Sequence, residues 1–282
     1  MRGYYIDLRV KADYPSWPPA WLEDIDRTMW VGVTQRALGS HERYICGEGE
    51  QWLDAAIAAG DLLVREQERQ GAYRGCWLHR FSLTHTFSPG VPWASALTQG
   101  QAASLLMRLA KHTADDRYLH SAIEALRPMR IASADGGVVA RLGGSPFFEE
   151  YPTDPPSLVL NGFMFALWGC YDVALGLGDD SARELVEEGL DTLAANLDRF
   201  DTGFWSRYDL YPHRVANIAS LAYHQLHIDQ LRATALLTDR EAFDEVAGRF
   251  ASYRNAPLNV ARATARKIVF RLAVPRKFTA VH

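Results

Sequence analysis

The sequence predicts a mainly α-helical protein: an (α/α) toroid, complete or incomplete, built from repeated helical hairpins with long loops and minor β-structure. Three observations lead to this fold class: helical spacing of apolar residues from about residue 50 onward, a helix pair that recurs, and long segments between the pairs. An irregular helical bundle is the alternative. The 282 residues, 48% of them hydrophobic, are enough to bury a large core.

The first expected helix lies in residues 51–71, where Trp52, Ala59 and Leu63 share one apolar stripe and Gly71 gives a stop signal. Helix pairs of similar pattern then follow in three segments, 99–126, 161–193 and 227–253. The second helix of each pair is expected to begin at Asp or Ser, whose side chains cap free N–H groups. Hairpins of this kind cannot each bury an apolar face alone, so they must stack on one another.

The turns of the three pairs align Asp116 with Asp180 and with Arg240, which are 64 and 60 residues apart. This spacing indicates a structural repeat of one hairpin per unit.

Three segments between the hairpins, 71–98, 128–156 and 200–214, are longer than the roughly 2–8 residues of ordinary helix connections. In a stack of hairpins such loops emerge at the same end, and long loops on a rigid scaffold usually carry the function. Short strands are expected in 135–143 and in 4–10, where apolar and polar residues alternate.

Charge and cysteine usage exclude several classes of protein. The formal net charge of −4 argues against general nucleic-acid binding. Cys46, Cys76 and Cys170 are an odd number and far apart, a pattern typical of neither a disulfide framework nor a metal site. The N-terminus has no apolar signal region, and no run is expected to reach the roughly 18 apolar residues of a membrane span. We therefore expect a cytoplasmic protein.

Residues 254–282 form a basic tail, which is expected to follow a single toroid domain in residues 1–253. The tail has seven Lys and Arg residues and no acid. As a helix it would separate apolar from basic side chains, namely Val260, Ile268, Val269 and Leu272 from Arg262, Arg266 and Arg276. Such segments favour anionic membrane surfaces, so we expect a peripheral membrane contact. The alternative is a last helix packed on the body, or a solvated tail.

Polar and aromatic side chains gather in the three predicted loops and at the helix starts that follow them. They are Trp93, Gln99 and Gln101 for the first loop, Glu149, Glu150, Tyr151 and Asn161 for the second, and Arg207, Tyr208, Tyr211, His213, Arg214, Tyr223, His224 and His227 for the third. Tyrosines, amides and arginines without metal spacing point to a sugar or uronate site.

Each feature taken alone has an ordinary interpretation. Glu149 and Glu150 can be a solvated pair, and Pro152 can mark a helix start. His224 and His227 lie three residues apart, but without an H-E-x-x-H motif or a third ligand we expect no metal.

The order of these residues along the chain is a stronger signal. The motifs are W-x-S-x-x-x-Q-G-Q at 93–101, E-E-Y-P-T-x-P-x-S-x-V-L-N-G-F at 149–163, Y-D-L at 208–210 and Y-H-x-x-H-I-x-Q-L at 223–231. Together they closely resemble the C-terminal helical domain of D-glucuronyl C5-epimerases, over about residues 75–253. The resemblance implies an (α/α)-toroid domain. It also implies inversion at C5 of glucuronate, giving iduronate, in heparosan or a heparan sulfate precursor.

Carried over by position, the resemblance implies Glu150 as the catalytic carboxylate and Tyr151, Tyr208 and Tyr223 as the catalytic tyrosines. The chain departs from the family's Y-D-L-R-H segment, because Tyr211 stands in place of the arginine. The predicted substrate contacts are Trp93, Gln99, Gln101, Glu149, Asn161, Arg207, Tyr211, His213, Arg214, His224 and His227.

C5 inversion removes a proton α to a carboxylate and returns one from the opposite face of the ring. It needs an acid and a base that face each other, and stabilisation of the growing carboxylate charge, but no redox cofactor. We predict Tyr151 or Glu150 on one face and Tyr223 on the other, with Tyr208 assisting and no cofactor.

A tyrosine base needs help, because its unperturbed pKa of about 10 must fall toward neutrality. Arg207, His213 and Arg214 are the candidate cations, and Arg214 is also a candidate to hold the substrate carboxylate.

Three other functions remain open. A polysaccharide lyase would abstract the same proton but expel the 4-O substituent, a hydrolase would use paired carboxylates, and a non-catalytic glycan-binding or assembly protein would keep only the fold. The expected partner is a uronate-containing polysaccharide, and no nucleic acid. A homodimer is a further expectation.

Overall fold

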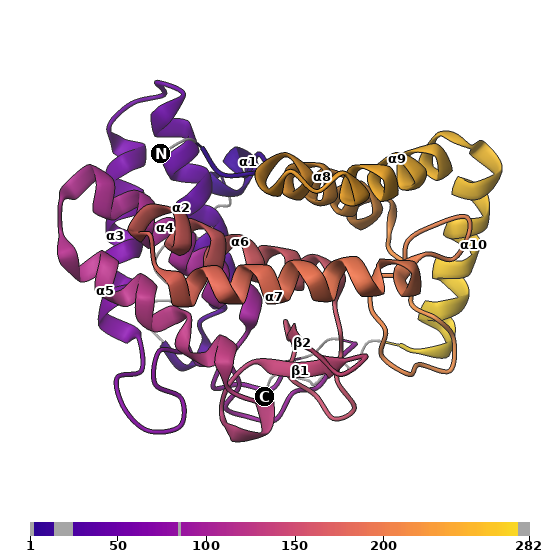
Figure 1. Ribbon diagram of the computed structural model, residues 1–282, viewed down its shortest axis with the longest axis horizontal. Coiled ribbons are helices and arrows are strands. Elements are labelled where there is room, and N and C mark those ends of the chain that lie inside the picture. Colours follow the sequence, from indigo (N-terminus) through magenta and orange to yellow (C-terminus); the bar gives the residue numbers. More distant parts are fainter. Residues whose placement is uncertain (1–2, 14–24, 84–85, 276–282) are drawn as a thin grey trace.

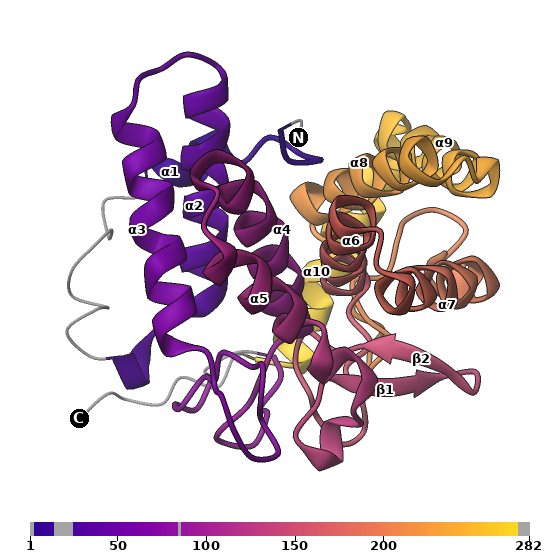
Figure 2. The ribbon, with the colours of Figure 1, turned by 60° about the vertical axis from the view of Figure 1, so that its left-hand side comes forward.

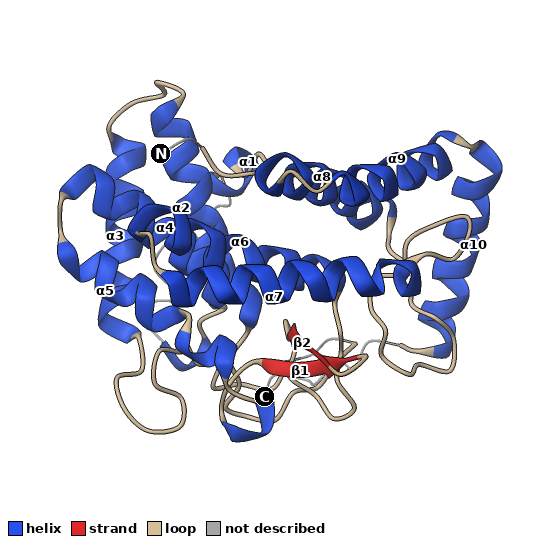
Figure 3. Cartoon of the chain, viewed as in Figure 1, coloured by secondary structure: helices blue, strands red, loops and turns tan. Residues whose placement is uncertain are grey.

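The computed structural model describes residues 3–13, 25–83 and 86–275, which form a mainly helical molecule with one small sheet (Figures 1 and 3). The hairpins are α2 (Trp30–Ile45) with α3 (Gln51–Glu66), α4 (Ala96–Thr113) with α5 (Asp116–Ala125), α6 (Leu160–Leu177) with α7 (Asp180–Asn196), and α8 (Leu221–Thr238) with α9 (Glu241–Asn255). The remaining helices are α1 (Arg9–Ala12), α10 (Pro257–Ala273) and the short 3-10 turns η2 (Ile25–Arg27), η3 (Arg127–Arg130), η4 (Ser133–Asp135) and η5 (Leu197–Phe200). The predicted array of helical hairpins is confirmed.

The hairpins stack in chain order along an arc (Figure 2). Their first helices contact one another in succession, α2 with α4, α4 with α6 and α6 with α8. Helix α6 lies at the centre of the stack. It is long and apolar enough to span a membrane, so the sequence-based statement that no run reaches this length was wrong. However, 78% of this helix is buried inside the fold, as befits the core helix of a globular protein.

The first hairpin contains a helix that the sequence pattern did not predict. Helix α2 buries Val33 and Leu38, but also Thr34, His41 and Glu42, among its neighbours. Polar residues on the buried face dilute the apolar spacing from which a helix is recognised. The strand expected in residues 4–10 was also wrong. The backbone there bonds to the Glu42 side chain and then turns into α1.

The small sheet consists of β1 (Val139–Leu142) and β2 (Ser145–Phe148), paired antiparallel. The expected strand in 135–143 is therefore confirmed as β1, whereas β2 was not foreseen because Pro146 occupies it. Phe147 and Phe148 at the end of β2 stack on Phe163 of α6, with ring centroids 4.3 and 5.3 Å away. This packing fixes the chain just before residue 149.

Two of the three predicted helix caps are present. Asp115 accepts a bond from Arg117 N at the start of α5, and Asp179 accepts one from Ala182 N at the start of α7. The third expectation was wrong: Arg240 precedes α9 and its side chain makes no capping bond.

Helix α10 lies across the end of the stack and packs against α9 (Figure 1). It buries Ala263 and Phe270, and Lys267 Nζ donates to Asn217 Oδ1 and Ile218 O at 2.7 Å each. Its other face leaves apolar side chains such as Leu272 exposed. The membrane contact stays a prediction, and Arg276, which it included, lies outside the described residues.

Candidate active site

The long loops meet at the N-terminal ends of α4, α6 and α8. Ala96 N at the start of α4 donates to Glu149 O at 2.8 Å, and Leu160 N at the start of α6 donates to Tyr208 O at 3.1 Å. The second loop is therefore bonded to the start of the first repeat's helix, and the third loop to the start of the next. The expectation that these loops converge is confirmed.

Glu149 closes the proline-rich turn that follows β2. Its carboxylate accepts bonds from Ser157 N, Ser157 Oγ and Leu158 N, each 2.8 Å long. Burial raises the pKa of Glu149 to about 7, while the three donors act in the opposite direction. The side chain is 0% exposed and is not part of the cleft lining, and its three bonds hold the turn.

Glu150 is held beside the first turn of α6. Asn161 Nδ2 donates to its Oε2 at 3.4 Å. A Cβ atom at Gly162 would lie 2.5 Å from the same oxygen, so only glycine allows this approach. Burial, and to a lesser degree the neighbouring Glu149, raises the pKa of Glu150 to about 7. Because the carboxyl lies at the positive end of α6, its charged form remains accessible near neutral pH.

Two tyrosines extend from Glu150 in a hydrogen-bonded chain. The Tyr151 side chain is bonded to Glu150 and to the hydroxyl of Tyr208. Burial, together with the nearby Glu150, raises the pKa of both tyrosines well above the usual value. Tyr223 packs edge-on against Tyr208 with ring centroids 4.9 Å apart. The structure thus brings together all four residues that the family resemblance implied as catalytic.

Glu150, Tyr151 and Tyr223 line a cleft of about 420 Å³, whereas Tyr208 lies beneath them and is not part of its lining. Its walls come from five parts of the chain. They are Ile6, Leu8 and Lys11 of the N-terminal segment, Val31 and Gln35 of α2, Leu97 of α4, Glu150 and Tyr151 with Asn161 and Phe165 of α6, and Ala222, Tyr223 and Leu226 of α8.

The N-terminal wall of the cleft was not predicted from the sequence. Lys11 and Gln35 belong to no recognised motif, and the alternation in residues 4–10 suggested a strand instead. Asp7, Arg9 and Asp13 are charged as well, so the local sequence contains no signal that would have singled out Lys11.

Two predicted glutamine contacts lie in the interior, away from the cleft lining. Gln99 Oε1 accepts from Trp77 N, and its Nε2 donates to Gly75 O and Ala125 O. Gln101 accepts from Thr34 Oγ1 at 3.3 Å. Both side chains are 0% exposed and neither is part of the cleft lining, so they hold α4 in place.

The two histidines of α8 are interior residues as well. The Nδ1 atoms of His224 and His227 lie 2.7 and 2.9 Å from Ser206 Oγ. His224 also stacks on Trp205 and its Nε2 is 3.0 Å from Phe250 O. Burial lowers the pKa of His224 to about 4 and that of His227 to about 3, so both rings are neutral. They fix the third loop to α8.

Trp93 and Tyr211 build the aromatic surroundings of Tyr151. Trp93 stacks on His79 at 3.9 Å, and its ring lies 6.0 Å from that of Tyr151. Phe87 stacks on Tyr151 at 5.2 Å and meets Tyr211 edge-on at 5.7 Å.

The cations that the sequence suggested as helpers do not line the cleft. Arg214 is exposed, and Arg207 is half-buried in a loop whose backbone pairs with Ile218. His213 Nε2 lies 3.4 Å from Asp209 Oδ1 and its ring packs on Phe270. Lys267 of α10 does not line the cleft either, but its Nζ lies 5.8 Å from the ring centroid of Tyr208.

Fold and site together define a helical toroid with a carboxyl–phenol cleft at the loop end of its helices. The family described as D-glucuronyl C5-epimerase C-terminus matches residues 67–252, which is more than half of the chain. The chain therefore belongs to the D-glucuronyl C5-epimerase C-terminal family.

Two relatives show the extent of this similarity. The D-glucuronyl C5-epimerase of Caenorhabditis elegans is 34% identical over 219 residues, 72% of this chain and 35% of that protein. An uncharacterized protein of Methanocaldococcus jannaschii is 27% identical over 192 residues, 64% of this chain and 60% of that one. The chain thus matches only part of the length of each relative.

The fold is shared with a solved carbohydrate-active enzyme. The unsaturated glucuronyl hydrolase of Bacillus sp. GL1, responsible for degradation of glycosaminoglycan, superimposes with a TM-score of 0.58. The match covers 88% of this chain and 66% of the hydrolase at 17% identity. At this identity the likeness concerns the fold alone, and it confirms the predicted (α/α)-toroid class.

Proposed function

We propose that this chain is a uronyl C5-epimerase that converts D-glucuronate to L-iduronate residues in a heparosan-type polysaccharide. One observation carries the proposal: a buried carboxyl, Glu150, lines the cleft and is hydrogen-bonded to Tyr151, with Tyr223 in the same cleft. Membership of the epimerase family supports the same reaction class. Tyr151 and Glu150 were equal candidates for the first acid–base group, and the geometry favours Glu150.

Glu150 is the group suited to remove the C5 proton. With a pKa raised to about 7, the carboxyl has both protonation states available near neutral pH, which is what efficient proton transfer requires. The carboxylate takes the C5 proton, and the electron pair of the broken C–H bond moves into the substrate carboxylate, which becomes an enediolate.

Tyr151 and Tyr208 are suited to be proton donors and not bases. Because burial raises the pKa of both hydroxyls, they stay protonated at neutral pH. The bonds from Tyr208 to Tyr151 and from Tyr151 to Glu150 stabilise the carboxylate before it accepts the proton.

Tyr223 is the candidate for the second face of the ring. It is 41% exposed, so its hydroxyl can exchange protons with solvent. In the proposed reaction this hydroxyl gives its proton to C5 of the enediolate. Glu150 then carries one extra proton and Tyr223 one fewer, and exchange with solvent restores both.

Product analysis tests this function. An unsulfated glucuronate-containing polymer is incubated with the protein, and the products are read by NMR, ultraviolet absorbance and chain length. We expect iduronate signals at unchanged chain length. New ultraviolet absorbance from an unsaturated uronate would replace the proposal with a lyase. Shorter chains without it would indicate a hydrolase, and binding without any product would indicate a glycan-binding protein.

A further inference from the structure

The N-terminal segment, residues 3–13, forms one wall of the cleft. Its residues Ile6, Leu8 and Lys11 face the same cavity as Glu150 and Tyr223. Among the described residues that line the cavity, Lys11 and Glu150 are the charged ones. Within this described lining, one carboxyl and one ammonium group come from segments that are far apart in the sequence.

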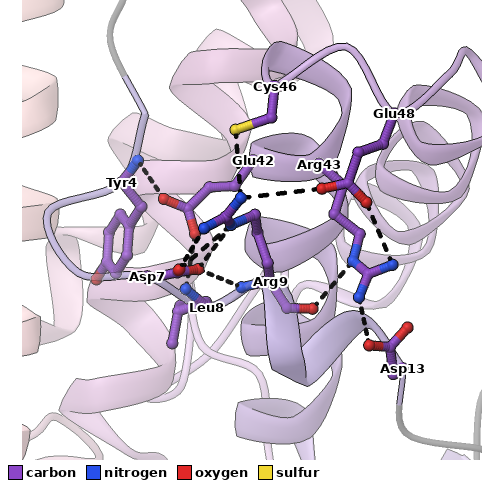
Figure 4. A network of polar contacts seen from close by, with 9 residues as sticks. All are labelled: Tyr4, Asp7, Leu8, Arg9, Asp13, Glu42, Arg43, Cys46 and Glu48. Atoms are coloured by element: carbon purple, nitrogen blue, oxygen red, sulfur yellow. Dashed lines mark hydrogen bonds and ion pairs between the residues drawn. The ribbon is translucent and has the colours of Figure 1, made fainter.

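The segment is anchored to α2 by a network of polar contacts (Figure 4). Glu42 of α2 accepts from Tyr4 N at 3.2 Å and from Leu8 N at 2.7 Å, so one carboxylate holds the backbone at residue 4 and again at residue 8. Arg43 Nε donates to Arg9 O at 3.2 Å, and its guanidinium pairs with Asp13. These bonds hold the backbone on either side of Lys11.

A close approach of backbones supports the same placement. A Cβ atom at Gly39 of α2 would lie 2.2 Å from Leu8 O and 3.3 Å from Ala12 N. Only glycine lets α1 lie directly on α2. Because the contact involves Leu8 and Ala12, it fixes the backbone on both sides of Lys11 at the wall of the cleft.

The segment is also tied to the core of the stack. Tyr5 Oη donates to Asp172 Oδ1 of α6 at 2.6 Å, and Arg108 Nη2 of α4 donates to Gly3 O at 3.2 Å. Asp172 and Arg108 form a buried ion pair with an N–O distance of 2.7 Å. Breaking the segment's contacts would leave this buried pair with fewer partners, which is costly.

A uronate ligand needs a cation in the cleft. Its carboxylate carries one negative charge and gains more as the C5 proton leaves, so a fixed positive group stabilises it most in the reacting state. Tyr211 occupies the position where the family resemblance implied an arginine, and Arg207 and Arg214 do not line the cleft. Glu150 alone would repel the ligand.

We propose that Lys11, held in place by Glu42 and Gly39, is the residue that binds the uronate carboxylate, and that the N-terminal segment thereby completes the active site. This inference rests on the proposed function for its substrate class. The ammonium group binds the carboxylate by a charge-assisted hydrogen bond and neutralises the enediolate. Residues 3–13 are thus part of the site and not a detachable end.

The test measures binding of two ligands to the full chain by calorimetry: a glucuronate oligosaccharide, and the same oligosaccharide with its carboxyl groups reduced to alcohols. We expect Lys11→Met to weaken binding of the first by about tenfold or more and to leave binding of the second nearly unchanged. Lys11→Arg should restore most of the preference for the charged ligand. Lys111→Met, on the exposed last turn of α4, is the matched control and should bind as wild type.

Equal affinity of Lys11→Met and wild type for the charged ligand would overturn the inference. So would an equal loss for both ligands, because that result would mean a damaged cleft. Circular dichroism confirms that each variant is folded, and Lys11→Gln provides a second variant with a polar side chain. Iduronate formation is measured in parallel. A wild type that binds through Lys11 but forms no iduronate would refute the proposed function while supporting the carboxylate site. Normal iduronate formation by Lys11→Met would support the proposed function and refute Lys11 as the carboxylate site.

Discussion

Glu149 and Glu150 are neighbours in the sequence with different environments. Glu149 is surrounded by three donors from Ser157 and Leu158 and holds a turn. Glu150 has one weak bond from Asn161, one from Tyr151, and an open side toward the cleft. A carboxyl whose bonding capacity is filled stabilises a loop, whereas one with spare capacity is available for chemistry. In the proposed function, the pair therefore divides structural and chemical roles between adjacent residues.

This division predicts opposite effects of two similar substitutions. Glu150→Gln should lower the rate of iduronate formation by about 10²-fold or more, the usual scale for one acid–base group, with little loss of stability. Glu149→Gln should mainly lower the melting temperature. The amide NH₂ would replace one accepting oxygen, so a buried backbone N–H would face another donor and lose its bond. Rates are measured by NMR and stability by thermal unfolding. A near-wild-type rate for Glu150→Gln would remove this residue from the chemistry.

Glu150 also predicts a pH dependence of stability. Its pKa is raised from the ordinary value of 4.5 to about 7 in the folded protein, so between these values the folded state binds more protons than the unfolded one. The contribution of Glu150 to the free energy of unfolding is therefore largest below about pH 4.5 and is lost as the pH rises to about 7.

The buried histidines act in the other direction. Because burial lowers the pKa of His224 and His227, they favour folding more as the pH rises toward 6.5. The measurement must therefore compare wild type with Glu150→Gln by denaturant unfolding at several pH values. The free energy of unfolding of wild type minus that of the variant should fall between about pH 4.5 and 7. A difference that stays constant would show that the carboxyl is not perturbed.

At the scale of elements, α10 is joined to the third loop by specific contacts. Phe270 is 0% exposed and meets the His213 ring edge-on at 5.1 Å. Lys267 Nζ donates to Asn217 Oδ1 and Ile218 O, and these two residues lead directly into α8, which contains Tyr223. The basic tail was expected either to pack on the body as a last helix or to be solvated. Residues 257–273 form the packed helix.

These contacts predict a cost for removing the buried ring of α10. Phe270→Ala should lower the free energy of unfolding by about 3 kcal/mol, the lower end of the usual cost for a buried phenylalanine. Ile268→Ala, on the exposed side of the same helix, is the matched control and should change it by less than about 0.5 kcal/mol. Both are measured by denaturant unfolding. Equal, small effects would mean that α10 contributes no packing to the body.

At the scale of the whole molecule, periodicity identified the helices whose buried faces are apolar. The pairs α4–α5, α6–α7 and α8–α9 have this pattern, and their turns fall where the sequence places them. Helix α2 escaped because its buried face includes Thr34, His41 and Glu42. Glu42 is one of the polar residues that weaken the apolar periodicity of this helix, and it also binds the N-terminal segment.

The candidate site was predictable only where residues follow one another in a motif. Glu150, Tyr151, Tyr208 and Tyr223 come from such motifs, and the fold brings them together. Lys11 reaches the cleft through long-range contacts with α2, which no local pattern encodes. Conversely, Gln99 lies in a motif because it bonds backbone groups of the first loop. A motif thus marks residues that matter, without separating scaffold from chemistry.

The central claim is that this cleft exchanges the C5 proton of a uronate between two faces. The most direct measurement is incubation of an unsulfated glucuronate polymer with the protein in D₂O, followed by NMR of the C5 position. We predict deuterium at C5 of both glucuronate and iduronate at unchanged chain length, and a loss of about 10²-fold in Glu150→Gln. Tight binding of the polymer by the wild type with no deuterium at C5 would contradict the claim.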